Sequence, residues 1–137
     1  MNPPVFSEKL DCKEELKEFI AVCGVAVAVA DQNVDTSEIK AIKRLLGKGT
    51  LANNLPELIA AGPEALGKRA QELSSMLVTR LSPLRCHKVV EDICSIAVAD
   101  GKTDEAEVDT LYGVAELLNV SLPFVDGVLS RVSKPLD

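Results

Sequence analysis

Carboxylates recur at the same spacing in two short segments of the chain, 69 residues apart. Each segment runs Ala-Val-Ala-Asp, with a second Asp four residues later and a Glu three residues after that. The acids are Asp31, Asp35 and Glu38 in the first segment and Asp100, Asp104 and Glu107 in the second. Several oxygen ligands within one turn suit hard divalent cations such as Ca²⁺, Mg²⁺ or Mn²⁺. The repeated acids are therefore candidate metal ligands.

The last two acids of each segment also fit a helix capping box. In that motif an Asp before the helix accepts a hydrogen bond from the backbone N–H of the Glu, and the Glu side chain reaches back. Capping leaves the first Asp of each segment unexplained, because it follows an apolar helical stretch, where the helix dipole disfavours an anion. Its partner would be a backbone N–H, a basic side chain or a cation. The metal-ligand interpretation and the capping interpretation therefore both stay open.

Two familiar loop motifs do not account for the second segment. An EF-hand counted from Asp100 would need ligands at Lys102, Val108 and Leu111, which cannot supply them. Residues 101–103, Gly-Lys-Thr, match the end of a phosphate-binding loop, but that motif requires glycine where the chain has Ile96. Neither calcium binding of the EF-hand type nor nucleotide binding is expected.

The residue pattern does not support a catalytic function. His87 is the only histidine. Its neighbour Cys86 would lie about 100° away around a helix, so the two do not form a nucleophile–base pair. Because no nucleophile, base and oxyanion donor converge, we expect a protein that is not an enzyme.

Composition limits the kinds of molecule that the protein is expected to bind. The chain has 137 residues and a formal net charge of −6, with a pI of about 4.8. Nucleic acid and anionic membranes would be repelled, whereas cations and basic protein surfaces would be attracted. The uncharged run at 19–30 is too short to span a bilayer. We therefore expect a protein partner, no nucleic acid and no membrane span.

The four cysteines predict free thiols. They are Cys12, Cys23, Cys86 and Cys94, and none forms a Cys-x-x-Cys pair. Three of them fall inside apolar helical patterns, which is typical of buried thiols rather than disulfides or metal ligands. Unpaired thiols favour a reducing compartment, so a cytoplasmic location is expected.

Helical periodicity and helix start and stop signals run through most of the chain. With only 3% aromatic residues, the core must be built from Leu, Ile, Val and Ala. The run at 25–30 also alternates like a strand, but it continues the apolar face of the helix before it, which favours helix. We predict one domain over 11–137 after a lead-in at 1–10. Its fold is all-α, a pseudo-twofold bundle of about seven helices near 11–31, 35–46, 55–61, 63–81, 83–99, 104–118 and 123–132.

The repeated unit resembles the TerB family, named for a tellurite-resistance protein. The resemblance rests on an apolar helix ending Ala-Val-Ala-Asp, an Asp-Gly turn at 100–101, a helix opening near Glu107, and the tail Leu-Leu-Asn-Val-Ser at 117–121. It implies an all-helical fold and divalent-cation binding by the six repeated acids, with Glu91 and Asp92 as looser candidates. It also implies a stress-related setting, and the chain is expected to be a domain that larger proteins also contain.

The two copies differ at one position of the turn. The first has Gln32 where the second has Gly101, so the second turn is the better candidate for a metal site. The alternative function is a purely structural protein-interaction module, in which the acids act only as helix caps.

Overall fold

The protein is a bundle of helices. The computed structural model describes residues 13–30, 36–47, 54–98 and 105–132, and these contain seven helices and no strand. The helices are α1 (Lys13–Ala28), α2 (Thr36–Leu46), α4 (Leu55–Ala61), α5 (Pro63–Arg80), α6 (Pro83–Ala97), α7 (Glu105–Leu117) and α8 (Leu122–Val132). The all-α prediction is confirmed. The boundary between lead-in and domain lies outside the described residues.

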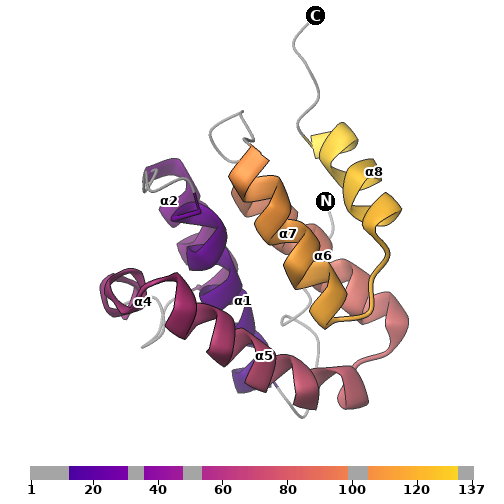
Figure 1. Ribbon diagram of the computed structural model, residues 1–137, viewed down its shortest axis with the longest axis horizontal. Coiled ribbons are helices and arrows are strands. Elements are labelled where there is room, and N and C mark those ends of the chain that lie inside the picture. The colour runs from indigo at the N-terminus through magenta and orange to yellow at the C-terminus, as the bar shows by residue number, and fades with distance from the viewer. Residues whose placement is uncertain (1–12, 31–35, 48–53, 99–104, 133–137) are drawn as a thin grey trace, which may run out of the picture.

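Helix α1 forms the centre of the bundle. It contacts α2, α4, α5, α6 and α7, and Figure 1 shows it behind the front layer of helices. Its residues from Phe19 to Val25 are all buried. A helix that is apolar on nearly every side must be enclosed by others. The Val/Ala run is therefore helical, because the helices around α1 bury its apolar side chains on all sides.

Helix boundaries follow the local chemistry of the sequence. Ser82 caps α6 by accepting a hydrogen bond from the backbone N–H of Arg85, with Pro83 at the first helical position. Gly47 ends α2 with a φ of 73°. Asn119 ends α7 with a φ of 59°, and the backbone N–H of Val120 donates to the carbonyl of Ala115 across this turn. That arrangement is a Schellman motif, which explains why an asparagine stops the helix.

The two helix pairs that carry the repeat contact each other reciprocally. Helix α1 contacts α7, and α2 contacts α6, besides the contacts within each pair and between α1 and α6. A twofold rotation that exchanged α1 and α2 with α6 and α7 would leave this pattern of helix contacts unchanged. The superposition of 16–47 on 85–116 stays a prediction. No described helix is both long enough and apolar enough to cross a bilayer.

Gly24 allows α1 to approach α2 and α6 closely. A Cβ atom at this position would lie 3.0 Å from Ile42 Cγ1 and 3.0 Å from Ile96 Cδ1. Both isoleucines are fully buried, so neither can move into solvent. The position therefore has no room for a branched side chain.

We expect Gly24→Val to destabilise the protein by about 1–3 kcal/mol through overpacking. Gly113→Val is the matched control, because it lies in α7 with nothing within 4 Å of its Cβ position. The control should change the free energy of unfolding by less than about 0.5 kcal/mol. Urea denaturation of both variants measures the difference, and equal effects would contradict the close approach at Gly24.

Candidate functional site

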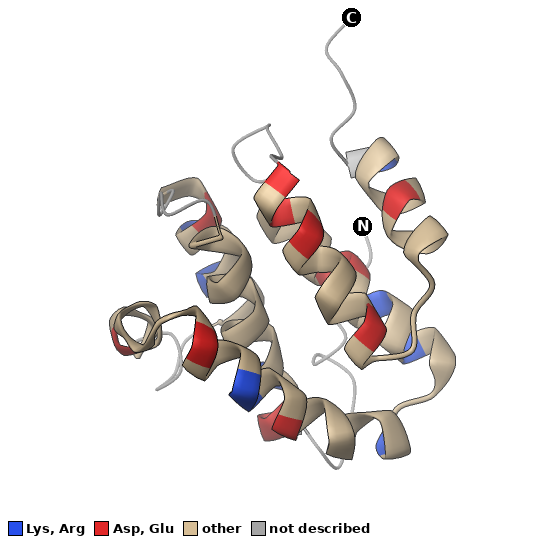
Figure 2. Ribbon diagram, in the orientation of Figure 1, with Lys and Arg blue, Asp and Glu red and all other residues tan. Residues whose placement is uncertain are grey.

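Only part of the repeated acid motif falls within the described structure. Asp31, Asp35, Asp100 and Asp104 lie outside the described residues. Glu38 and Glu107 occupy the first turns of α2 and α7. Both helices begin toward the upper end of the bundle in Figure 1, and Figure 2 shows acidic residues near both of these helix ends.

The two glutamates are buried. Glu38 is 1% exposed and Glu107 is 5% exposed, whereas Glu105, in the same turn as Glu107, is exposed. Glutamate is rarely buried without compensation, because a carboxylate loses its hydration energy there. Capping alone does not require burial. Two equivalent positions that both bury a carboxylate are therefore the main structural finding at this site.

Sequence reasoning missed this burial, although a signal for it was present. Glu38 precedes Ile42 by four residues, and Glu107 precedes Leu111 by four. Residues four apart lie on one helix face, and both Ile42 and Leu111 are fully buried. The apolar face of each helix thus begins at its glutamate.

The helices before the two turns bury the faces that lead toward them. Cys23 and Val27 of α1 and Ile93 and Ala97 of α6 are buried, as their spacing predicts. The last turns of α1 and α6 therefore contribute buried side chains to the core. The first aspartates of the motif follow these faces in sequence.

The looser candidates Glu91 and Asp92 are engaged by basic side chains. Lys88 Nζ lies 3.4 Å from Glu91 Oε1 and 3.3 Å from Asp92 Oδ1. From α8, Arg131 Nη2 lies 3.2 Å from Glu91 Oε2. Their charge is thus already compensated within and between helices. Within the described ranges no three His, Cys, Asp or Glu side chains come together as a metal site.

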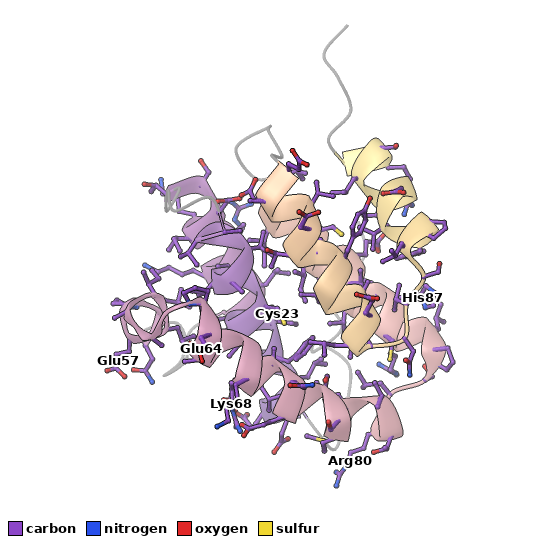
Figure 3. The ribbon with its side chains drawn as sticks, in the orientation of Figure 1. Cys23, Glu57, Glu64, Lys68, Arg80 and His87 are labelled. Atoms are coloured by element: carbon purple, nitrogen blue, oxygen red, sulfur yellow. The ribbon has the colours of Figure 1, made fainter. Side chains whose placement is uncertain are left out.

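The described cysteines are inert thiols. Cys23, Cys86 and Cys94 are free and buried, and Figure 3 shows Cys23 inside the bundle. Burial raises the pKa of all three, and that of Cys94 reaches about 12, with the charge of Glu91 as a further cause. A thiol that stays protonated at neutral pH is neither a nucleophile nor a soft-metal ligand. The prediction of buried free thiols is confirmed for these three, and Cys12 lies outside the described residues.

We expect the Cys12→Ser variant to react slowly with a disulfide reagent such as dithionitrobenzoate at pH 8. The raised pKa values and burial together keep thiolate away from the reagent. Addition of denaturant should expose all three remaining thiols at once. Absorbance of the released thionitrobenzoate measures the rate, and a fast-reacting thiol in the folded protein would contradict the burial.

His87 has a structural role. Its Nδ1 lies 2.7 Å from the carbonyl oxygen of Pro83, a geometry in which the ring N–H donates to the backbone. Its ring packs edge-on against Phe124, with centroids 4.6 Å apart. The hydrogen bond lies within the start of α6, and the ring contact joins that helix to α8.

The chain belongs to the TerB family of helical proteins. Residues 17–123 match the family described as Tellurite resistance protein TerB. The match begins inside α1, covers α2, α4, α5, α6 and α7 completely and reaches the start of α8. Comparisons with curated proteins and with solved structures each gave no significant match.

Proposed function

We propose that the protein is a non-enzymatic module that binds a divalent cation through the repeated carboxylates. The ligands would be Asp31, Asp35 and Glu38 in one turn and Asp100, Asp104 and Glu107 in the other. Carboxylate oxygens favour Ca²⁺, Mg²⁺ or Mn²⁺ over metals that prefer nitrogen or sulfur.

The observation that carries this proposal is the burial of Glu38 and Glu107 at equivalent positions. Taking a carboxylate out of water is unfavourable unless donors or a cation compensate it. The first turns of α2 and α7 each supply one such carboxylate. The other four acids of the motif lie close to these glutamates in the sequence. The net charge of −6 adds a general attraction for cations.

The alternative is a structural interaction module in which the acids only cap helices. In that case Asp104→Ala would cost about 1 kcal/mol with or without cation. Both glutamates already have interaction partners in the structure, and a capping-box glutamate accepts a backbone hydrogen bond, so their burial is compatible with capping. The first Asp of each segment, which capping does not use, is what favours the cation.

Glutamine replacements distinguish the two functions. Glutamine also serves at the third position of a capping box, so Glu107→Gln keeps the cap and removes the charge. Without cation, Glu107→Gln should change the melting temperature little, because glutamine can accept the same capping hydrogen bond. With Ca²⁺, Mg²⁺ or Mn²⁺ at millimolar concentration, the wild type should gain stability and Glu107→Gln should lose most of that gain.

Glu105→Gln is the matched control. It removes an exposed carboxylate from the same helix turn, so its response to cations should match that of the wild type. We also expect Glu38→Gln to retain more of the response than Glu107→Gln, because Gly101 favours the second turn. If Glu105→Gln lost as much of the cation-induced stabilisation as Glu107→Gln, the stabilisation would depend on overall charge and not on the buried glutamate.

We further propose a cytoplasmic setting related to stress, with a protein partner. The family's tellurite-resistance description and the buried free thiols support this proposal. The absence of catalytic activity is likewise our proposal, supported by the protonated thiols and the structural engagement of His87.

A further inference from the structure

Helices α1, α2 and α6 meet at one buried point, one helical turn before the end of α1. Ile42 of α2 and Ile96 of α6 each lie 3.0 Å from the Cβ position of Gly24. All three residues are buried. A core packed this closely has no free space to absorb a displacement, so movement of one isoleucine affects the other. The start of α2 and the end of α6 are therefore mechanically connected.

This contact lies close in sequence to both groups of repeated acids, the first acidic segment at 31–38 and the second at 100–107. Ile42 follows Glu38 by four residues, so the two lie on one face of α2. Ile96 is the second-last residue of α6, and Asp100 follows it by four residues. Each acidic segment thus has an acid four residues from an isoleucine that packs at Gly24.

We propose that the two acidic segments bind cations cooperatively, through the contact that Ile42 and Ile96 make at Gly24. This inference rests on the cation binding proposed above. A cation held by Glu38 would fix the start of α2, and thereby the position of Ile42 against Ile96. The second acidic segment would then lose less conformational freedom when it binds, which increases its affinity. The effect of the second segment on the first must have the same size.

Repulsion between the two cations opposes this cooperativity only weakly. Each acidic segment would supply three carboxylates to one divalent cation, so an occupied segment keeps a net negative charge. Dissolved salt further screens the interaction between charges near the surface. The packing contact therefore determines the sign of the cooperativity, and a variant that changes packing without changing charge can isolate it.

NMR titrations of the full chain with Ca²⁺, Mg²⁺ and Mn²⁺ measure binding at each segment separately. The amide signal of Gly101 reports on the second segment and that of Gln32 on the first, through shifts with Ca²⁺ or Mg²⁺ and broadening with Mn²⁺. Glu38→Gln should raise the half-saturating concentration at Gly101 by about fivefold or more. Glu107→Gln should raise that at Gln32 by a similar factor, as reciprocity requires.

Ile96→Val tests whether packing carries the effect. It removes the Cδ1 methyl that lies against Gly24 and leaves every carboxylate in place. In this background, Glu38→Gln should raise the half-saturating concentration at Gly101 by less than about twofold. Ile20→Val is the matched control, because it removes the same methyl from a fully buried isoleucine one helical turn before Gly24. It should keep the fivefold effect, and circular dichroism should show that both variants fold, as such small truncations allow.

The possible failures separate coupling from binding. If neither amide signal responded to any of the three cations, cation binding itself would be contradicted, and the coupling with it. If the signals responded but Glu38→Gln left the half-saturating concentration at Gly101 unchanged, the coupling alone would be overturned. An undiminished effect in the Ile96→Val background would also overturn the proposal, because charge rather than packing would then connect the two segments.

Discussion

Phe19→Ala should lower the free energy of unfolding by about 3–5 kcal/mol, the largest effect that we expect from a single substitution. Phe19 is fully buried in α1, the helix that contacts five others. Its removal would leave a cavity at the centre of a core built almost entirely from aliphatic side chains.

Urea denaturation followed by circular dichroism measures this loss. Phe19→Leu should cost less than about 1.5 kcal/mol, because it keeps most of the buried volume. Phe124→Ala is the control in α8, where the ring is only half-buried, and should cost about 1–2 kcal/mol. If Phe19→Ala cost no more than Phe124→Ala, α1 would not be the centre of the core.

Cation binding should produce the second large effect. A cation at 100 times its dissociation constant would stabilise the wild type by about 2.7 kcal/mol. The double variant Glu38→Gln/Glu107→Gln should show no such stabilisation, because it removes the buried carboxylate from both turns. In the absence of cation, the double variant should be about as stable as the wild type, because glutamine keeps the capping hydrogen bonds.

Differential scanning calorimetry with chelator, and then with each of Ca²⁺, Mg²⁺ and Mn²⁺, measures this effect. The pair Glu105→Gln/Glu57→Gln removes two exposed carboxylates from α7 and α4 and serves as the control. It should retain the full response. If the control lost the response as completely as the double variant, binding would depend on net charge alone.

Local chemistry made the helix boundaries predictable. Ser82 followed by proline, Gly47 and Asn119 each impose a start or a stop through their own backbone or side-chain preferences. The helical state of the Val/Ala run in α1 followed from the continuous apolar face before it. These features depend on residues close in sequence, which is why they could be read without the fold.

Contacts between distant segments could not be predicted in this way. The ion pair between Arg131 and Glu91 and the ring contact between His87 and Phe124 depend on how α8 packs against α6. The burial of Glu38 and Glu107 is an intermediate case. Their spacing to Ile42 and Leu111 placed them on the apolar face, but the capping-box pattern favoured a solvated first turn.

Isothermal titration calorimetry of the wild type with Ca²⁺, Mg²⁺ and Mn²⁺ tests the central claim most directly. We predict saturable binding of at least one of these cations below millimolar concentration, weaker binding in Glu107→Gln and none in the Glu38→Gln/Glu107→Gln double variant. Absence of binding by all three cations to the wild type at millimolar concentration would contradict the claim and leave the repeated acids as helix caps.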